Sequence, residues 1–152
     1  MRIRATGLAD VDLVAQLRVD FLCDVRRLDR DELPAGFADA TAAWVRDHAE
    51  RGVLHSWLAG SDDEVAGGVS LLLHPVPPQV DELRPYDGYV INMFVRPAHR
   101  RAGVGRALLD AIVGAAPSLG LRSMSLATTD EGRPLYESMG FAGQPDWMRR
   151  RL

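Results

Sequence analysis

The residues with the clearest chemical potential are Arg-Arg-Ala-Gly-Val-Gly-Arg at positions 100–106. They follow an apolar run, YVINMFV at 89–95, and lead into a stretch with apolar residues at helical spacing. The two glycines let the backbone approach a ligand closely, and the free N–H groups at a helix start favour an anion. Guanidinium groups match phosphate oxygens in geometry as well as in charge. The segment therefore predicts that a pyrophosphate binds at the start of this helix.

The same residues have two other interpretations. A tight connection between a strand and a helix, with its arginines in solvent, also places glycines in a turn. A dinucleotide-binding fold of the Rossmann type needs G-x-G-x-x-G, but Leu108 stands where the third glycine should be. The Rossmann interpretation is therefore disfavoured, while the plain turn remains open.

The composition excludes several mechanisms. The chain has 152 residues, and all 18 of its basic residues are arginine. Without lysine there is no Walker-type phosphate loop, no Schiff base and no attachment of pyridoxal phosphate. A net charge of -3 argues against nucleic acid as a partner, and a single cysteine without metal-ligand spacing predicts no metal site. No apolar run approaches the roughly 20 residues of a membrane span and no signal peptide is evident, so we expect a cytoplasmic protein without a membrane partner.

Hydrophobic spacing predicts the elements that must position the 100–106 segment. The expected strands are 2–5, 53–59, 65–74, 89–95 and 121–127, with edge strands from Phe141 and the tail WMRRRL. The expected helices are one that contains Val11, Val14, Ala15 and Leu17, and then 34–52, 105–116 and 131–139. The order predicts a single α/β domain over 1–152, whose mixed sheet has an antiparallel first half, a parallel central pair of strands and helices on both faces.

Three stretches in the second half of the chain carry a family resemblance. Residues 100–105 fit the pattern R/Q-x-x-G-x-G/A, NMFVRP at 92–97 forms the strand before it, and RPLYESMGF at 133–141 is a helix with Tyr followed by Gly-Phe. In this order they resemble the signatures of the GCN5-related N-acetyltransferase (GNAT) superfamily, and the agreement in elements extends over nearly the whole chain. The resemblance implies the GNAT-type sheet and an acetyl-CoA-dependent acyltransferase, here expected in a bacterial cytoplasm.

The resemblance also implies which residues bind acetyl-CoA. The turn would hold the pyrophosphate, mostly through backbone N–H groups, at Arg100, Arg101, Ala102, Gly103, Val104 and Gly105, with Arg106 adding a side chain. The family's central strand usually carries a bulge that splays it from the next strand. Its matching residues, Met93, Phe94 and Val95, would pair with pantetheine and offer an N–H to the oxyanion. Thr129 stands where many members have an Asn that contacts the pantetheine arm.

Tyr136 matches the family tyrosine that often protonates the departing thiolate. A phenol has a pKa of about 10, so it keeps its proton at neutral pH and can donate it. The alternative is that Tyr136 only packs, with its hydroxyl bonded to the cofactor. We therefore expect Tyr136 to be the general acid.

The general base has no clear counterpart. Several family members have Glu where Tyr89 stands here, and a tyrosine is no base near pH 7. Asn92 takes no proton but can orient a water or an acceptor, so Tyr89 and Asn92 are expected to face the acceptor. Water-mediated action as a base stays open for Asp81, Glu82 and Asp87.

The expected function is the transfer of an acetyl group from acetyl-CoA to an amine by direct attack in a ternary complex. The acceptor is a small-molecule or protein amine, and neither nucleic acid nor a metal is expected. An alternative is an acyl-CoA-binding module that senses or docks without catalysis. A homodimer is left open as a further alternative to a monomer.

Overall fold

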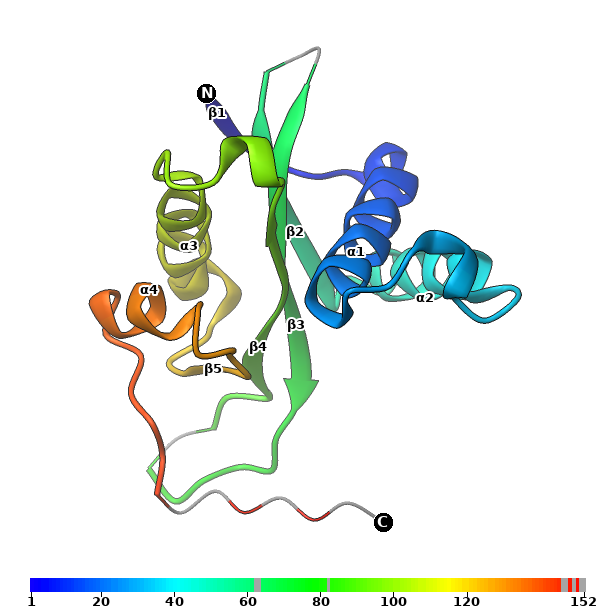
Figure 1. Cartoon of the computed structure of the whole chain (residues 1–152). Helices are drawn as coiled ribbons and strands as arrows, with labels where there is room; N and C mark the ends of the chain where they lie inside the picture. Colours follow the sequence, from blue (N-terminus) through cyan, green and yellow to red (C-terminus); the bar gives the residue numbers. More distant parts are fainter. Residues whose placement is uncertain (62–63, 82, 146–147, 149, 151–152) are drawn as a thin grey trace.

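The computed structural model describes residues 1–61, 64–81, 83–145, 148 and 150. Helices on each side of a central sheet give an α/β architecture (Figure 1). In chain order the elements are β1 (Arg2–Ala5), α1 (Val11–Arg26), α2 (Phe37–Glu50), β2 (Leu54–Gly60), β3 (Val65–Pro75), β4 (Tyr86–Val95), α3 (Val104–Ala115), β5 (Met124–Leu126) and α4 (Arg133–Ser138).

The strands lie in the sheet in their chain order, from β1 to β5. The pairs from β1 to β4 are antiparallel, and β4 with β5 is parallel. Helix α3 makes the crossover between these two parallel strands. It lies with α4 on the face of the sheet opposite α1 and α2 (Figure 1). These features confirm the predicted fold: an antiparallel first half, a parallel pair and helices on both faces.

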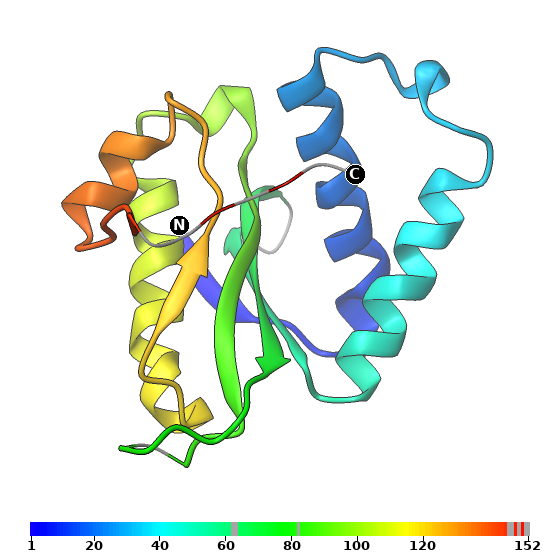
Figure 2. The same cartoon turned by 90° about the horizontal axis from the view of Figure 1, so that it is seen from below.

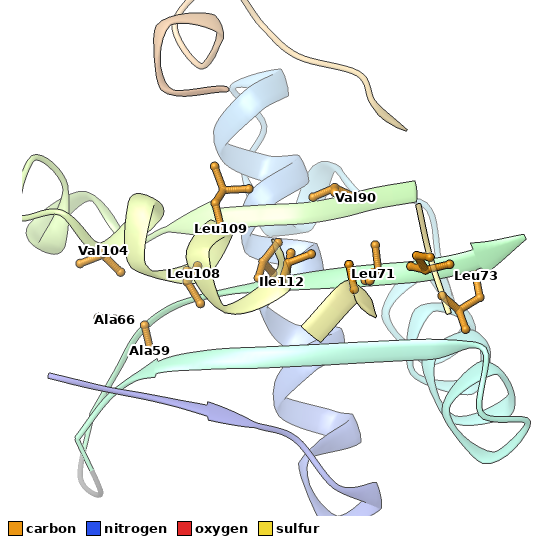
Figure 3. Close-up of a cluster of buried hydrophobic side chains, with 12 residues drawn as sticks. Ala59, Ala66, Leu71, Leu73, Val90, Val104, Leu108, Leu109 and Ile112 are labelled. Carbon is orange, nitrogen blue, oxygen red and sulfur yellow. The ribbon is translucent and has the colours of Figure 1, made fainter. Parts of the chain in front are cut away.

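Alternation along the strands divides the hydrophobic core between the two faces of the sheet. On the α3 face, Leu71 of β3 packs with Leu108 and Ile112 of α3, and all three are completely buried (Figure 3). On the α1 face, Val14 of α1 packs with Leu54 of β2 in a separate cluster. Because helices cover both faces, the middle strands can be apolar on both sides, as the run at 89–95 predicted.

A β-bulge interrupts β4 at Asn92. Gly68 of β3 pairs with Phe94 and Ser70 pairs with Ile91, so Asn92 and Met93 together lie opposite one β3 residue. Asn92 has a φ of 56°, in the left-handed region that Asn tolerates better than most residues. The bulge that the family resemblance implied is therefore present in the central strand.

The close approach of β3 to this part of β4 depends on a glycine. A Cβ atom at Gly67 would lie 2.4 Å from the carbonyl oxygen of Phe94, a distance that no side chain allows. Gly67 thus lets the two backbones come together beside the bulge.

Three elements begin three residues away from their predicted start. Helix α2 begins at Phe37 rather than at 34, because Gly36 takes the N-cap position with a φ of 77°. Strand β4 begins at Tyr86 rather than at 89, because Tyr86 already pairs with Pro75. Strand β5 covers Met124–Leu126 only, since Leu121 is buried beneath α3 instead of continuing the strand.

The predicted edge strand at Phe141 is wrong. The N–H of Phe141 donates to the carbonyl of Tyr136 at 3.1 Å, and that of Gly140 donates to Glu137 at 3.1 Å. With Gly140 at a φ of 86°, these bonds form a Schellman motif that ends α4. Phe141 is therefore part of a helix cap, and the tail residues Trp147, Arg149, Arg151 and Leu152 lie outside the described residues.

Candidate functional site

The turn before α3 presents a row of free backbone N–H groups. Arg101 and Gly103 are both in the left-handed region, with φ values of 61° and 79°. The first helical hydrogen bond runs from the N–H of Ala107 to the carbonyl of Gly103 at 3.0 Å. Within the described chain, the N–H groups of residues 101–106 donate to no acceptor. Such a concave set of N–H groups at a helix start binds anions, so these residues fit a pyrophosphate.

The arginines of this turn differ in what they contact. Arg100 turns back toward the protein, where its Nε donates to the carbonyl of Val95 at 3.0 Å and its Nη2 lies 2.7 Å from Asp24. It also lies 5.9 Å from the centre of the Phe94 ring. Arg101 is exposed, and Arg106 donates to Ser138 of α4 at 3.3 Å. The side chain of Arg100 thus connects the turn to α1 in this structure, and the anion site consists mainly of backbone.

Beside this turn, β4 and β5 diverge. Gly88–Val90 pair with Met124–Leu126, and the pairing ends there. From Ile91 to Val95, β4 has no strand partner on its β5 side within the described chain, and the segments that follow the β4–β5 pairing separate from each other (Figure 2). Met93 and Val95 contact the core on the α3 face, whereas Phe94 contacts Leu17 on the α1 face. The predicted pantetheine-binding residues therefore lie along a strand edge that is free to pair with an extended ligand.

Tyr136 lies on α4, on the same side of the sheet as this turn. Burial raises the pKa of Tyr136 above its ordinary value of 10.0, so the hydroxyl keeps its proton. The hydroxyl makes no hydrogen bond within the described chain. The Schellman motif fixes its position, because Phe141 packs edge-on against the Tyr136 ring at 5.9 Å between centroids. Tyr136 therefore has a fixed position and a protonated hydroxyl, and this hydroxyl has no acceptor among the described residues.

Thr129 belongs to the same corner of the molecule. Its hydroxyl accepts a hydrogen bond from the N–H of Gly132 at 3.2 Å, just before α4. A Cβ at Gly132 would lie 3.3 Å from the Tyr136 ring and 3.0 Å from the Thr128 hydroxyl oxygen. The hydroxyl proton of Thr129 is free to donate to a ligand, and its contact with the pantetheine arm stays a prediction.

Polar side chains gather on the opposite face of β4, next to α1. Asn92 is only 6% exposed, and its Oδ1 accepts a short hydrogen bond, 2.5 Å, from Nη1 of Arg18. Its Nδ2 is buried and has no partner within the described chain. It borders a cavity of about 10 Å³ that also contains the hydroxyls of Ser56 and Ser70, which are 2.7 Å apart. That volume is about one water molecule.

Arg18 was not identified from the sequence, although a signal was present. It stands on the face of α1 that carries Val14, Leu17 and Phe21, where apolar residues recur at helical spacing. A charged residue on such a face either reaches solvent or has a polar partner in the interior. Its partner is Asn92. Tyr89 lies on the same α1 side of β4, beside Leu72 of β3, so the two predicted acceptor-facing residues share one face with Arg18.

Of the carboxylates considered as a base, Asp87 is bound at the start of β4 rather than at the bulge. Asp87 accepts hydrogen bonds from Nε of Arg84 at 2.7 Å and from Ser123 at 2.9 Å. Burial alone would raise the pKa of Asp87, but the bonds from Ser123 and Arg84 outweigh it and hold the pKa below its ordinary value. Asp81 is exposed, and Glu82 lies outside the described residues. Asp87 therefore serves as an anion that fixes the start of β4.

The described residues lack two further kinds of feature. They contain no group of three or more His, Cys, Asp or Glu side chains arranged to hold a metal ion. Among them, no helix has both the length and the apolar character needed to cross a bilayer.

Several solved structures are similar to this fold over nearly their whole length. A predicted acetyltransferase from Clostridium acetobutylicum, whose crystal structure contains acetyl-CoA, is 20% identical, with a TM-score of 0.85 over 99% of this chain and 95% of that one. A GCN5-related N-acetyltransferase from Ralstonia eutropha JMP134 is 25% identical, with a TM-score of 0.83 over 99% and 97%. A ribosomal-protein-alanine N-acetyltransferase from Brucella melitensis biovar Abortus 2308 is 21% identical, with a TM-score of 0.67 over 100% and 99%.

Sequence comparison extends this likeness. Among curated protein sequences no significant match was found. The acetyltransferase (GNAT) family, in contrast, matches residues 19–141, which include α1, the bulged strand, the anion-binding turn and Tyr136. Since this match spans most of the chain, and since the fold agrees with the solved structures, the protein belongs to the acetyltransferase (GNAT) family.

Proposed function

We propose that the protein transfers an acetyl group from acetyl-CoA to an amine, by direct attack of the amine in a ternary complex. The observation that carries the proposal is the turn of residues 101–106, whose unbonded N–H groups lie beside the free edge of β4. A diphosphate and an extended arm are the two parts of acetyl-CoA that these features would recognise. The solved acetyltransferase from Clostridium acetobutylicum, with its acetyl-CoA, supports the same choice of donor.

The donor occupies the α3 face in this proposal. Backbone N–H groups of residues 101–106 bind the pyrophosphate, and the α3 dipole adds to their attraction. Met93, Phe94 and Val95 offer their strand edge to the pantetheine arm. When bound, acetyl-CoA supplies an activated thioester carbonyl, and an N–H of this strand edge polarises its oxygen.

Tyr136 acts as the general acid. Its raised pKa keeps the phenol protonated at neutral pH, and its hydroxyl has no competing acceptor within the described chain. A proton donated by Tyr136 makes the departing thiolate a better leaving group. The Schellman motif and the Phe141 ring support this role, because they fix the tyrosine on α4.

The acceptor amine approaches from the α1 face of β4, opposite the pyrophosphate turn. At pH 7 only about one part in 2,500 of a primary amine with an ordinary pKa is neutral, so the amine must lose a proton first. Asp87 is held by Arg84 and Ser123, so it is not available as a base. The proton therefore leaves to water in this proposal, and the rate should rise with pH as more amine becomes neutral.

Two measurements test the function. Calorimetric titration with acetyl-CoA should give 1:1 binding, and a panel of amines should release free CoA thiol. Titration without heat of binding would contradict the proposal at its first step. The pH dependence of thiol release gives a further check, because a rate that falls between pH 6 and 8 would exclude attack by a solvent-deprotonated amine.

An acyl-CoA-binding module without catalysis is the second candidate. Tyr89 at the position where several relatives carry Glu, together with the ion-paired Asp87, favours it. It predicts tight binding of acetyl-CoA with no thiol release from any amine of the panel. Thiol release above the buffer rate would decide for the enzyme.

A further inference from the structure

We propose that Arg18 binds an acidic group of the acceptor, so that the preferred substrates are amines that also carry a carboxylate. This inference rests on the proposed function and adds the class of its acceptor. It concerns the α1 face of β4, where Arg18 is hydrogen-bonded to Asn92 and where Tyr89 lies on the same face of the strand.

The position of Arg18 suits contact with an acceptor. Its Nη1 is 2.5 Å from Oδ1 of Asn92, and Asn92 forms the bulge directly before Met93, Phe94 and Val95. The guanidinium therefore lies beside the strand edge at which the acetyl group is expected. It is on the opposite face of the sheet from the turn of residues 101–106, so bound pyrophosphate does not occupy it. Arg18 is partly buried and still accessible.

No acidic side chain among the described residues forms an ion pair with Arg18. Other arginines form an ion pair with an aspartate, namely Arg4, Arg30, Arg46, Arg51, Arg84 and Arg100. Arg18 has only the neutral carboxamide of Asn92 as a partner in the described chain. Charged groups that are drawn out of water are normally paired. Burial lowers the pKa of Arg18, which agrees with a cation that is short of solvation.

The nearby acidic residues do not supply the missing anion. Asp20 on α1 is paired with Arg30, and Asp24 is paired with Arg100. Each of these two carboxylates is therefore already neutralised by an arginine. Among the described residues, Arg18 is thus a cation beside the bulge without an ion-pair partner, and its charge favours an anionic group on the acceptor.

The geometry of the guanidinium favours a carboxylate. Asn92 takes one of its five N–H donors and holds the fork in place, which leaves other N–H groups for a ligand. A planar fork of N–H groups matches a carboxylate with two parallel hydrogen bonds. The acceptor class is therefore an amino acid, a related amino carboxylic acid or a peptide terminus with a nearby acidic group.

The test uses pairs of amines that differ in the carboxylate. Suitable pairs are L-leucine with L-leucinamide, L-phenylalanine with phenethylamine, and 4-aminobutyrate with butylamine, which together vary the spacing between the two groups. For each pair, kcat/KM from CoA thiol release gives a preference ratio. We expect at least one pair to favour the carboxylate by about 10- to 100-fold, as a charge-assisted bond would.

Variants then assign the preference to Arg18. Arg18→Gln removes the charge but keeps an N–H donor for Asn92, and should reduce the preference ratio to within about threefold of unity. Arg18→Lys keeps the charge and should retain part of the preference. Arg26→Gln is the matched control, because Arg26 is exposed on the same helix. Comparing ratios between variants removes differences in intrinsic amine reactivity.

The outcomes separate this inference from the proposed function. Equal use of both members of every pair, or an unchanged ratio in Arg18→Gln, would overturn the role of Arg18 while acetyl transfer stands. An Arg18→Gln variant that loses acetyl-CoA affinity by calorimetry would instead assign Arg18 to the donor, and would also overturn the inference. Absence of thiol release from every amine would reject the proposed function itself. In that case, titration with L-leucine and L-leucinamide still tests whether Arg18 selects the carboxylate.

Discussion

In the proposed function, the two faces of the sheet would recognise their ligands by different means. On the α3 face the expected contacts come from backbone groups, the free N–H groups of residues 101–106 and the edge of β4. On the α1 face they come from side chains, above all Arg18 held by Asn92. Backbone recognition depends on chain conformation and suits a donor that many related enzymes share. Side-chain recognition depends on single residues, so one fold can accept many different acceptors by changing only this face.

The largest effect is expected from a charge placed among the backbone N–H groups of residues 101–106, which form the candidate anion site and are called the cradle below. Gly105→Asp puts a carboxylate among the N–H groups that would bind pyrophosphate, and like charges in contact cost several kcal/mol. We expect the Kd for acetyl-CoA to rise by about 1,000-fold, measured by calorimetry.

Two controls accompany this variant. Gly105→Ala adds only a Cβ, which would meet the Leu135 side chain at 3.1 Å, and so separates crowding from charge. Gly114→Asp adds the same charge to the same helix at a site where a Cβ meets nothing within 4 Å. If Gly114→Asp weakened binding as much as Gly105→Asp, the cradle would not be the anion site.

The next effect concerns proton donation on the α3 face. Tyr136→Phe should lower kcat by about 100-fold while the Kd for acetyl-CoA changes little, because only the transferable proton is lost. Tyr86→Phe removes a hydroxyl from another partly buried tyrosine and should leave kcat unchanged. An unaltered kcat in Tyr136→Phe would leave the tyrosine with a packing role only.

The pH profile refines the same prediction. Because burial raises the pKa of Tyr136 above 10.0, the acid stays protonated as acceptor amines become neutral. The wild-type kcat should therefore not fall before pH 10, and stability owed to this group should decline only as pH rises from 10 toward the folded-state pKa. A descending limb that begins near pH 8 would point to a different acid.

A smaller effect tests how the bulge is held. Asn92→Gly and Asn92→Ala both remove the acceptor for Arg18, but only glycine adopts a φ of 56° without strain. We expect the alanine variant to be about 1 kcal/mol less stable to urea than the glycine variant. Equal unfolding free energies would mean that the side-chain contact, rather than the backbone conformation, maintains the bulge.

The smallest effect concerns the ion pair that joins the two faces. Asp24→Asn removes the negative charge of the ion pair between Asp24 of α1 and Arg100. The Asp24 side chain is 36% exposed and the Arg100 side chain is 38% exposed. Solvent screens such a pair, so we expect a loss below about 1 kcal/mol in unfolding free energy. Acetyl-CoA affinity should stay nearly unchanged, because backbone forms the cradle. A large change in affinity would show that the two faces are not independent.

The sequence predicted the α3 face much better than the α1 face. Glycines at 103 and 105 after an apolar strand identify the turn, because Gly103 adopts a φ of 79°, which few residues tolerate, and a Cβ at the helical Gly105 would crowd Leu135. Gly140 likewise indicated where α4 ends, although the strand expected at Phe141 is a cap instead. The role of Asn92 in the bulge and its bond to Arg18 depend on two residues 74 positions apart in the chain, and local patterns carry no such information.

Two boundaries of elements were also predicted incorrectly, for reasons that lie outside the elements themselves. The run 121–127 has the alternation of a strand, yet only Met124–Leu126 pair with β4. Leu121 is buried in the core on the α3 face before the strand begins, and the bulge in β4 follows shortly after the pairing ends at Val90 and Leu126. Helix α2 begins at Phe37 because Gly36, and not Pro34, adopts the capping conformation. Both outcomes depend on neighbouring segments, which single-sequence patterns do not describe.

The short pairing between β4 and β5 has a consequence for how the protein behaves in concentrated solution. An unpaired strand edge attracts other strands, and open edges are a common starting point for aggregation. From Ile91 to Val95 the edge of β4 faces the gap without a strand partner in the described chain. A ligand that lies along this edge blocks the addition of another strand there. Binding of such a ligand should therefore also reduce aggregation of the protein.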